Sequence, residues 1–382
     1  MKILIAPDSF KGSATALEVG NALTMGFRRI FPQAEIMVLP MADGGEGTVS
    51  SLVSATGGKI RSSVVKNPIG VPIIAKYGVL GDATTAIIEM SAASGLTLIS
   101  SEQQNPLVTT TYGTGQLILS ALNDGCRRLI IGIGGSATND GGAGMAQALG
   151  VVLKTQNGMP ISLGGQGLSE LAEIDISNLD DRLGETEVVV ACDVDNPLTG
   201  AKGASFVYGR QKGATPEMME ILDQNLAHYA LVIEKRLGRN VGNLPGAGAA
   251  GGLGAGLVTF TDAELKPGID IVTKTVKLAE HLEGVDLVIT GEGQLDEQTI
   301  HGKTPVGVAK IAQQRNIPVV AIAGGIKGNP TELYQKGITA MIDITPKPMP
   351  LNRVMERTIP LLEQASERVA RLILIGGSLL KD

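Results

Sequence analysis

The sequence predicts an α/β protein whose main domain is a doubly wound parallel sheet, interrupted by a second, inserted α/β domain. Short apolar runs alternate with helical patterns at both ends of the chain, and glycine-rich loops follow several of these runs. The middle of the chain has a different pattern. With 382 residues, 43% hydrophobic and 18% charged, the chain is long enough to bury two cores.

The N-terminal segment begins with a buried strand at residues 2–6, a continuous apolar run. Thr15 and Glu18 have the spacing of a capping box, which predicts that a helix starts there. A second strand is expected at residues 36–39, and the loop DGGEG then leads into a helix from about Thr48.

Three further apolar runs, at residues 286–290, 318–323 and 340–344, are separated by helical segments. Together with the two N-terminal strands they suit a parallel sheet with the strand order 2-1-3-4-5. The main domain is therefore expected to comprise residues 1–70 and 261–382.

The inserted α/β domain is expected at residues 71–260. At its border, residues 60–90 alternate in polarity around an Asn-Pro-Ile-Gly turn, which indicates antiparallel hairpins. Further elements are expected as helices at 115–121 and 216–237 and strands at 128–133 and 188–191. Two domains connected by two chain segments predict a cleft between them. The glycine-rich loops of both domains could face this cleft.

Composition excludes several classes of protein. The net charge is −6, aromatic residues make up 3%, and there is no tryptophan, which argues against nucleic acid or a membrane surface as a partner. Two cysteines, Cys126 and Cys192, do not suggest a disulfide framework. No signal segment or membrane span is recognisable, so a cytoplasmic protein is expected. Whether the chain forms a homo-oligomer is left open.

The most informative motif is GIGGSATNDGGAG at residues 132–144, directly after an apolar strand. Glycines and small hydroxyl residues at the end of a strand free backbone N–H groups to converge on an anion, which predicts a phosphate cradle. The competing interpretation is a glycine-rich turn that only packs tightly. The other glycine-rich loops of the chain favour the cradle.

Charged residues follow the first two predicted strands. Asp8 and Lys11 lie in APDSFKG, at the carboxyl end of the first strand, where ligands gather in such sheets. They could hold a substrate hydroxyl and a phosphate, although a charge pair at a helix start is the alternative. Asp43 and Glu46, in ADGGEG, occupy the equivalent place after the second strand.

The segment TGEGQLDEQTIHGKTP follows the third strand of the predicted sheet. Glu292 and Asp296 offer hard oxygen ligands for Mg²⁺, and Lys303 is available for phosphate. A P-loop is excluded because glycine would be needed where Glu297 stands. His301 could bond substrate or phosphate, or serve as a structural hydrogen bonder.

Other glycine patterns carry weaker signals. GIGGSA could be interpreted as a dinucleotide fingerprint, but the acidic residue that should follow it is missing. PGAGAAGGLG, from Pro245, does not follow a strand, which favours tight helix packing. Whether a nucleotide binds nearby is left open.

Asp193 follows a buried strand and could polarise a hydroxyl. Cys192, without a histidine partner, is expected in the core.

Taken in order, eight segments spread over most of the chain resemble the bacterial type I glycerate kinase family: APDSFKGS, ADGGEGT, VTTTYGTG, IGIGGSATNDGGAGM, ACDVDNPL, PGAGAAGGLG, TGEGQLD and HGKTP. The resemblance implies transfer of a phosphoryl group from ATP to D-glycerate, with a flavodoxin-like domain interrupted by a second α/β domain. Two positions depart from the family pattern. Arg210 stands where proline is expected, and Gln294 where a basic residue is common.

Phosphoryl transfer needs positioning and charge neutralisation rather than a covalent nucleophile. Two catalytic roles have two candidate residues each. Lys11 or Lys303 would meet the transferred phosphoryl group, and Asp8 or Asp193 would accept the proton of the substrate hydroxyl. Residues expected to hold or orient the phosphate or the glycerate carboxylate are Asp43, Glu46, Gly134, Gly135, Ser136, Thr138, Asn139, Asp140 and His301. For Asn139 and Asp140, orienting the metal is the alternative. Glu292 and Asp296 are the expected Mg²⁺ ligands.

Phosphorylation of the 2-hydroxyl is expected from the resemblance alone, and the 3-hydroxyl is the alternative. Two other classes remain open. A non-catalytic binding protein for a small acid would share a cleft between domains, but it would usually carry an export signal. A hydroxy-acid oxidoreductase that uses NAD would need the ribose carboxylate that is missing here.

Overall fold

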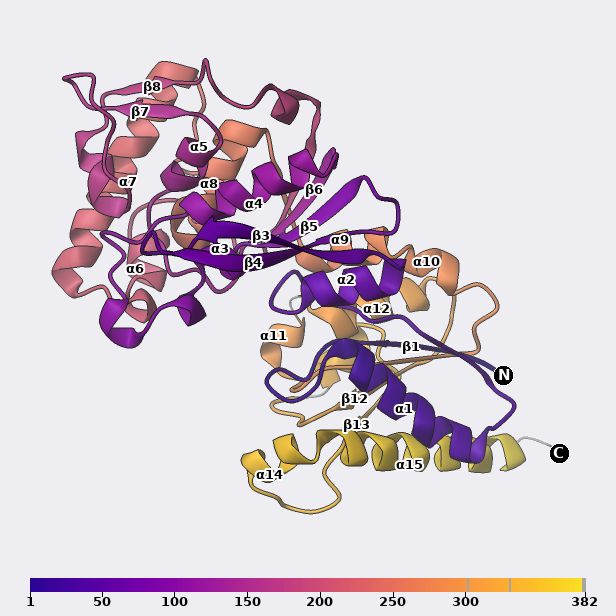
Figure 1. Ribbon diagram of the computed structural model, residues 1–382. Helices are drawn as coiled ribbons and strands as arrows, with labels where there is room; N and C mark the ends of the chain where they lie inside the picture. Colours follow the sequence, from indigo (N-terminus) through magenta and orange to yellow (C-terminus); the bar gives the residue numbers. More distant parts are fainter. Residues whose placement is uncertain (301, 330, 380–382) are drawn as a thin grey trace. The chain divides into compact units, whose positions relative to one another are not determined.

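The computed structural model describes residues 1–300, 302–329 and 331–379, which form two compact units (Figure 1). The first unit comprises Met1–Asp43, Ser50–Thr56 and Ile269–Asp382, and the second comprises Gly44–Val49 and Gly57–Gly268. In this division, residues 57–70 and 261–268 belong to the second unit and not to the first, which contains the two ends of the chain. The domain boundaries expected from the sequence, at 70/71 and 260/261, remain a prediction.

The first unit contains a five-stranded, entirely parallel sheet with the order β13-β12-β11-β1-β2. Its strands are β1 (Lys2–Pro7), β2 (Glu35–Val38), β11 (Leu287–Gly291), β12 (Val319–Ala323) and β13 (Ala340–Asp343). The five strands predicted from apolar runs are confirmed, each within a residue or two. Because β1 lies between β2 and β11, two segments far apart in the sequence become neighbours.

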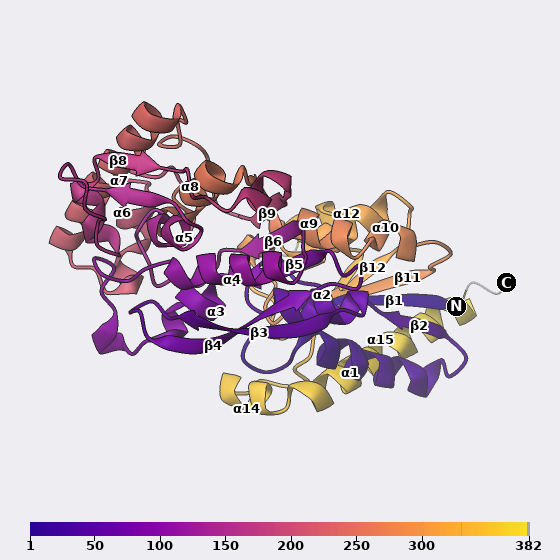
Figure 2. The same cartoon turned by 45° about the horizontal axis from the view of Figure 1, so that its top comes forward.

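The first unit also contains the helices α1 (Ala16–Ile30), α9 (Gly268–Thr275), α10 (Leu278–His281), α11 (Glu297–Ile300), α12 (Thr304–Gln313), α13 (Thr331–Gln335), α14 (Leu351–Glu356) and α15 (Thr358–Leu379). Of these, α1, α12 and α15 pack against strands of the unit's sheet. Thr15 and Glu18 form the predicted capping box of α1. The two helices α1 and α15, from opposite ends of the chain, lie side by side in Figures 1 and 2, and Arg29 of α1 pairs there with Glu363 and Glu367.

The second unit contains a six-stranded sheet with the order β10-β9-β6-β5-β4-β3. Its strands are β3 (Lys59–Lys66), β4 (Pro72–Val79), β5 (Thr85–Glu89), β6 (Arg128–Gly132), β9 (Glu187–Ala191) and β10 (Glu264–Lys266). The pairs β3–β4 and β4–β5 are antiparallel, which confirms the predicted hairpins, and the other pairs are parallel. A separate antiparallel pair joins β7 (Val152–Lys154) and β8 (Glu173–Asp175).

The longer helices of the second unit are α4 (Tyr112–Asn123), α7 (Pro216–Leu237) and α8 (Ala249–Thr261), with shorter ones at α3 (Ser91–Ser94), α5 (Ala143–Ala148) and α6 (Ala204–Tyr208). Helix α2 (Thr48–Thr56) begins in the second unit and continues in the first. Short 3₁₀ turns are η1 (Leu96–Leu98), η2 (Ser101–Gln103), η3 (Gly165–Glu170), η4 (Asp181–Glu185) and η5 (Arg210–Lys212).

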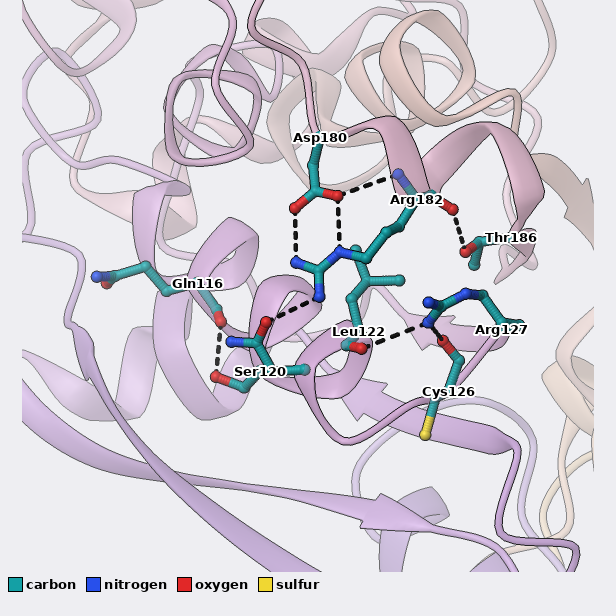
Figure 3. A network of polar contacts seen from close by, with 9 residues as sticks. Gln116, Ser120, Leu122, Cys126, Arg127, Asp180, Arg182 and Thr186 are labelled. Atoms are coloured by element: carbon teal, nitrogen blue, oxygen red, sulfur yellow. Dashed lines mark hydrogen bonds and ion pairs between the residues drawn. The ribbon is translucent and has the colours of Figure 1, made fainter.

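Polar contacts fasten the end of α4 to the turn η4 (Figure 3). The guanidinium of Arg182 donates two hydrogen bonds to the carboxylate of Asp180, at 2.7 and 2.8 Å, and a third, at 2.9 Å, to Asn123 at the last position of α4. Arg127 donates to the carbonyl oxygens of Leu122, in the last turn of α4, and of Cys126, just beyond the helix. The carbonyl of Leu122 also accepts from the N–H of Gly125, so the last turn of α4 finds hydrogen-bond partners beyond the helix.

The PGAGAAGGLG segment packs as tightly as the sequence predicts. Ala250, Gly251 and Gly252 have left-handed backbone angles that kink the start of α8. A Cβ at Gly251 would lie 2.0 Å from the carbonyl oxygen of Thr138, and one at Gly256 would lie 2.6 Å from that of Gly141. These glycines therefore allow α8 to press against the loop that follows β6.

Among the described helices, none has the length and apolarity required to span a bilayer.

Candidate active site

Two carboxylates follow neighbouring strands of the first unit. Pro7 of β1 is in register with Gly291 of β11, and the backbone N–H of Asp8 donates to the carbonyl oxygen of Gly291 at 2.8 Å. Asp8 and Glu292 therefore occupy equivalent positions, one residue beyond the carboxyl ends of adjacent parallel strands. This is the edge of an open α/β sheet at which ligands bind.

The carboxylate of Asp8 is held by two donors. Its Oδ2 accepts a hydrogen bond of 2.5 Å from the hydroxyl of Thr304, and its Oδ1 accepts one of 2.6 Å from the N–H of Ser9. Burial raises the pKa of Asp8 to about 6, the negative charge of Asp43 adds to the effect, and the two hydrogen bonds oppose it. A carboxylate with this pKa is suited to exchange a proton near neutral pH.

Glu292 is buried, with 8% of its surface exposed. Its Oε1 accepts a hydrogen bond of 2.7 Å from the hydroxyl of Thr299, and its Oε2 lies 4.0 Å from Nζ of Lys303. Burial raises the pKa of Glu292 to about 7. The Thr299 hydroxyl and the charge of Lys303 lower it, whereas the charges of Asp8 and Asp43 raise it further.

The charges of Asp43 and Asp8 both act on Glu292, so three of the predicted carboxylates form one electrostatic group in the first unit. Lys11 approaches the same segment through its backbone, because a Cβ at Gly293 would lie 3.7 Å from the N atom of Lys11. The tertiary structure thus brings together residues 8–11, 43, 292–299 and 303, which lie in parts of the chain far apart in the sequence.

Asp296 has a different environment from Glu292. Its two oxygens accept hydrogen bonds of 2.9 Å from the side-chain amide of Gln294 and from the backbone N–H of Gln298. Burial acts to raise the pKa of Asp296, but these hydrogen bonds and the charge of Lys303 outweigh it and hold the pKa below its usual range. Gln294, which departs from the family pattern, therefore orients an expected metal ligand. His301 lies outside the described residues.

Lys303 is the N-cap of α12, and its side chain is one-third exposed. The following residue, Thr304, is the first of the helix and holds Asp8. Unpaired N–H groups and the helix dipole favour negative charge at this end of α12. Lys303 is thus positioned both to face Glu292 and to meet an anion.

In the second unit, the glycine-rich loops approach each other at the carboxyl ends of parallel strands. Glu89, Gly132 and Ala191 are in register at the ends of β5, β6 and β9. A Cβ at Gly132 would lie 2.6 Å from the carbonyl oxygen of Gly44, and one at Gly44 would lie 2.5 Å from the side chain of Ala191. Side chains at these glycines would separate the ADGGEG loop from the strand ends.

Glu89 organises the ADGGEG loop, and the sequence analysis missed it. Its Oε1 accepts a hydrogen bond of 2.9 Å from the N–H of Val49, in the first turn of α2. Burial raises the pKa of Glu89, and backbone hydrogen bonds from Val49, Gly47 and Thr48 oppose the rise. A carboxylate that ends an apolar run, Ala-Ile-Ile-Glu, was the available signal. Glu46, a predicted ligand, stays exposed in this loop.

The loop after β6 divides into an exposed part and a buried part. Gly134 and Gly135 are exposed, whereas Ser136 is only 6% exposed. The predicted residues Thr138, Asn139 and Asp140 are fully buried. The carbonyl oxygen of Gly135 accepts from the N–H of Leu96 at 2.9 Å, and the rest of the exposed backbone of the two glycines is open to a ligand. The three side chains further along lie inside the unit.

Asp140 is satisfied within the unit. Its carboxylate accepts hydrogen bonds from the N–H and hydroxyl of Thr111, from the hydroxyl of Thr110 and from the N–H groups of Gly142 and Gly144. Burial raises the pKa of Asp140, and the hydrogen bonds from Thr111, Gly142 and Gly144 oppose the rise. These contacts tie the loop to the VTTTYGTG segment, whose threonines the sequence analysis did not single out.

Asp193 follows β9 and is exposed. Its Oδ1 accepts a hydrogen bond of 2.9 Å from the N–H of Gly268. Cys192 beside it is partly exposed and is a free thiol, as is buried Cys126. Burial raises the pKa of Cys192, which disfavours the reactive thiolate.

Each of the two units thus carries groups suited to an α/β phosphotransferase. Carboxylates with raised pKa values, a lysine at a helix N-terminus and glycine loops with exposed backbone are what positioning and charge neutralisation of a phosphoryl group require.

Comparison with known proteins identifies the family. A model of the glycerate kinase family matches residues 3–374. The chain is 53% identical to a glycerate kinase of Bacillus subtilis (strain 168), with 99% of each chain covered. It is 50% identical to a glycerate 2-kinase of Escherichia coli (strain K12), covering 98% of this chain and 99% of that protein. The chain therefore belongs to the glycerate kinase family.

A solved structure supports the same conclusion. The crystal structure of a candidate glycerate kinase 2 from Salmonella typhimurium LT2 superposes with a TM-score of 0.92 at 50% identity, and 99% of each chain is covered. The mixed α/β architecture is thus shared with a relative of known structure over nearly the whole chain.

Proposed function

We propose that the protein transfers the γ-phosphoryl group of ATP to the 2-hydroxyl of D-glycerate, with ADP and 2-phospho-D-glycerate as products. Full-length identity of about half to proteins named glycerate kinase carries this proposal. The name glycerate 2-kinase of the Escherichia coli relative supports the 2-position over the 3-position. We also infer a flavodoxin-like first unit, interrupted in sequence by the second.

The proton acceptor is one of the three carboxylates of the first unit that interact electrostatically, Asp8, Asp43 and Glu292. Asp8 is favoured over Asp193, because burial raises the pKa of Asp8 to about 6, whereas Asp193 is exposed and already bonded to the N–H of Gly268. A substrate hydroxyl beside Asp8 would give up its proton to Oδ1 or Oδ2 as its oxygen attacks phosphorus.

Cations and backbone N–H groups neutralise the phosphate charge. Lys303 lies at the N-terminus of α12, and Lys11 lies beside Gly293 in the same unit. In the second unit, Gly134 and Gly135 expose backbone that a phosphate or the glycerate carboxylate can approach. Ser136 to Asp140 would then shape this loop from inside rather than contact the ligand.

A magnesium ion fits the donor set of the first unit. Within the described part of the chain, no group of three or more His, Cys, Asp or Glu side chains could hold a metal ion. Mg²⁺ bound with ATP needs no such cage, because it is usually held by one or two carboxylates, water and substrate phosphates. Glu292 and Asp296 would supply these carboxylates, and the ion would neutralise phosphate charge.

The test is direct. The purified protein, incubated with ATP, Mg²⁺ and D-glycerate, should release ADP only when all three are present, and phosphorus NMR should show a phosphate ester at the 2-position. A 3-phosphoglycerate signal would assign the other hydroxyl. Binding of D-glycerate without ADP release would indicate the remaining alternative, a non-catalytic binding protein.

A further inference from the structure

Lys212 is the only buried lysine in the part of the chain that the structure describes. It ends the turn η5 in the second unit, with 1% of its surface exposed. Its Nζ donates a hydrogen bond of 2.7 Å to the backbone carbonyl oxygen of Thr138. The ammonium thus reaches the loop that follows β6 and not solvent.

The carbonyl that Lys212 binds is confined on a second side. A Cβ at Gly251 would lie 2.0 Å from the same oxygen, so the Thr138 carbonyl sits between the ammonium and the kinked start of α8. The N–H of Gly141 donates to the carbonyl oxygen of Gly251 at 3.0 Å, which ties the two segments together. Residues 138–141 are therefore held by contacts from outside the loop.

Lys212 also interacts electrostatically with Asp140, a buried residue of the same loop. Burial lowers the pKa of Lys212 to about 7, and the negative charge of Asp140 opposes the decrease. The ring of Tyr229, from α7, packs against Gly141, and the charge of Asp140 acts on its hydroxyl as well. Asp140 itself is saturated with hydrogen bonds from the backbone and threonines.

Stability alone does not account for an ammonium at this position. Removing a lysine charge from water is unfavourable, and an apolar side chain of similar volume is often as stabilising or more so. A methionine would fill the same space without that cost. The contribution of Lys212 is therefore specific to the hydrogen bond that it makes.

We propose that Lys212 is a positioning residue for the phosphotransfer reaction: by holding the Thr138 carbonyl, it fixes the conformation in which Gly134 and Gly135 present their backbone to the ligand. Gly134 and Thr138 both belong to one loop that starts at the end of β6. This inference rests on the proposed function of the loop, although the conformational part can be tested without activity.

The central variant is Lys212→Met, which keeps a long unbranched side chain and removes the donor. The matched control is Lys235→Met on α7, where the lysine is exposed. We expect Lys212→Met to lower kcat/KM for glycerate phosphorylation about 100-fold, the effect of a misplacement of about 1 Å. The melting temperature should stay the same or rise. A purely structural lysine would give the opposite pattern, a lower melting temperature with unchanged kcat/KM of the folded enzyme, and would overturn the proposal.

Hydrogen exchange separates this inference from the proposed function. In Lys212→Met, amide exchange of residues 134–142 should accelerate at least about 10-fold relative to wild type, while the strands of the same sheet keep their protection. If the wild type phosphorylates no glycerate, the proposed function fails, but the exchange result still decides whether Lys212 orders the loop. Unchanged exchange in the loop would overturn the proposal whatever the activity.

Discussion

The hydroxyl of Thr304 donates a hydrogen bond of 2.5 Å to Oδ2 of Asp8 and so joins the end of β1 to the first residue of α12. The two residues are 296 positions apart in the sequence. The contact orients a carboxylate at a helix N-terminus, where negative charge is favoured, while burial acts against that charge. The result is a carboxyl group that can change protonation state near neutral pH.

Replacing Asp8 with asparagine should stabilise the fold at neutral pH. Because burial raises the pKa of Asp8 from 3.8 to about 6, the folded chain keeps a proton that the unfolded chain loses between these values. Wild-type stability therefore falls as the pH rises from about 4 to about 6. Asp8→Asn should remove this part of the decline. We expect its free energy of unfolding at pH 7 to exceed that of wild type by about 2–3 kcal/mol. Urea unfolding at pH 4.5 and 7.5 measures this difference.

The control for this stability change is Asp270→Asn, at an exposed position in α9. It should leave the difference between the two pH values as in wild type. An Asp8→Asn protein with the wild-type difference would show that the Asp8 carboxyl is solvated in solution.

The identity of the base should appear in the comparison of Asp8→Asn with Asp193→Asn. Loss of a general base typically costs 10²–10⁴-fold in rate, and we expect this loss in kcat for Asp8→Asn only. The wild-type rate should rise with pH through about 6, the pKa of Asp8, and the remaining activity of the variant should not. A large loss in Asp193→Asn with a small one in Asp8→Asn would reverse the assignment.

The magnesium requirement should depend on Glu292 and Asp296. Glu292→Gln and Asp296→Asn should each raise the Mg²⁺ concentration for half-maximal velocity about 10-fold or more at fixed ATP, with the fold intact by circular dichroism. Because a metal competes with the proton and burial raises the pKa of Glu292 to about 7, this concentration should fall in wild type as the pH rises from 6 to 8.

Glu297→Gln, at an exposed neighbouring position, is the control for the metal experiment and should behave as wild type. Unchanged turnover and metal response in Asp296→Asn would remove Asp296 from the metal site.

Alanine at Gly132 should disturb the contact between the two glycine loops of the second unit. Its Cβ would lie 2.6 Å from the carbonyl oxygen of Gly44, so the ADGGEG loop must move. We expect kcat/KM to fall by about 10²-fold, the effect of a small misplacement at a reacting centre. Gly184→Ala, where a Cβ would meet nothing within 4 Å, should retain wild-type kinetics. Equal activity of the two variants would show that this contact does not serve the reaction.

Local patterns made much of the fold predictable. The strands of the first sheet are short apolar runs, and the start of α1 is a capping box, so both follow from neighbouring residues. Helix α7 spans Pro216–Leu237 as predicted, since Thr215, Pro216 and Gly238 mark its two ends. The boundaries between units depend on which segments touch, which no local pattern encodes.

The candidate site was predictable to a similar extent. Asp8 and Glu292 could be placed at strand ends because each directly follows an apolar run. Their shared environment, the support that Thr299 and Thr304 give them, and the role of Glu89 all depend on partners outside the local pattern. Thr138, Asn139 and Asp140 belong to a ligand-like motif by sequence, yet they are buried in the structure.

The sequence by itself determined the succession of strands and helices, the glycine-rich loops and the residue types available for phosphoryl transfer, because these depend on residues close together along the chain. Only the tertiary structure decided which carboxylates lose their contact with water, which loops touch and which buried lysine holds the Thr138 carbonyl. The physical reason is that desolvation and close backbone approach arise from atoms that folding brings together from distant parts of the chain.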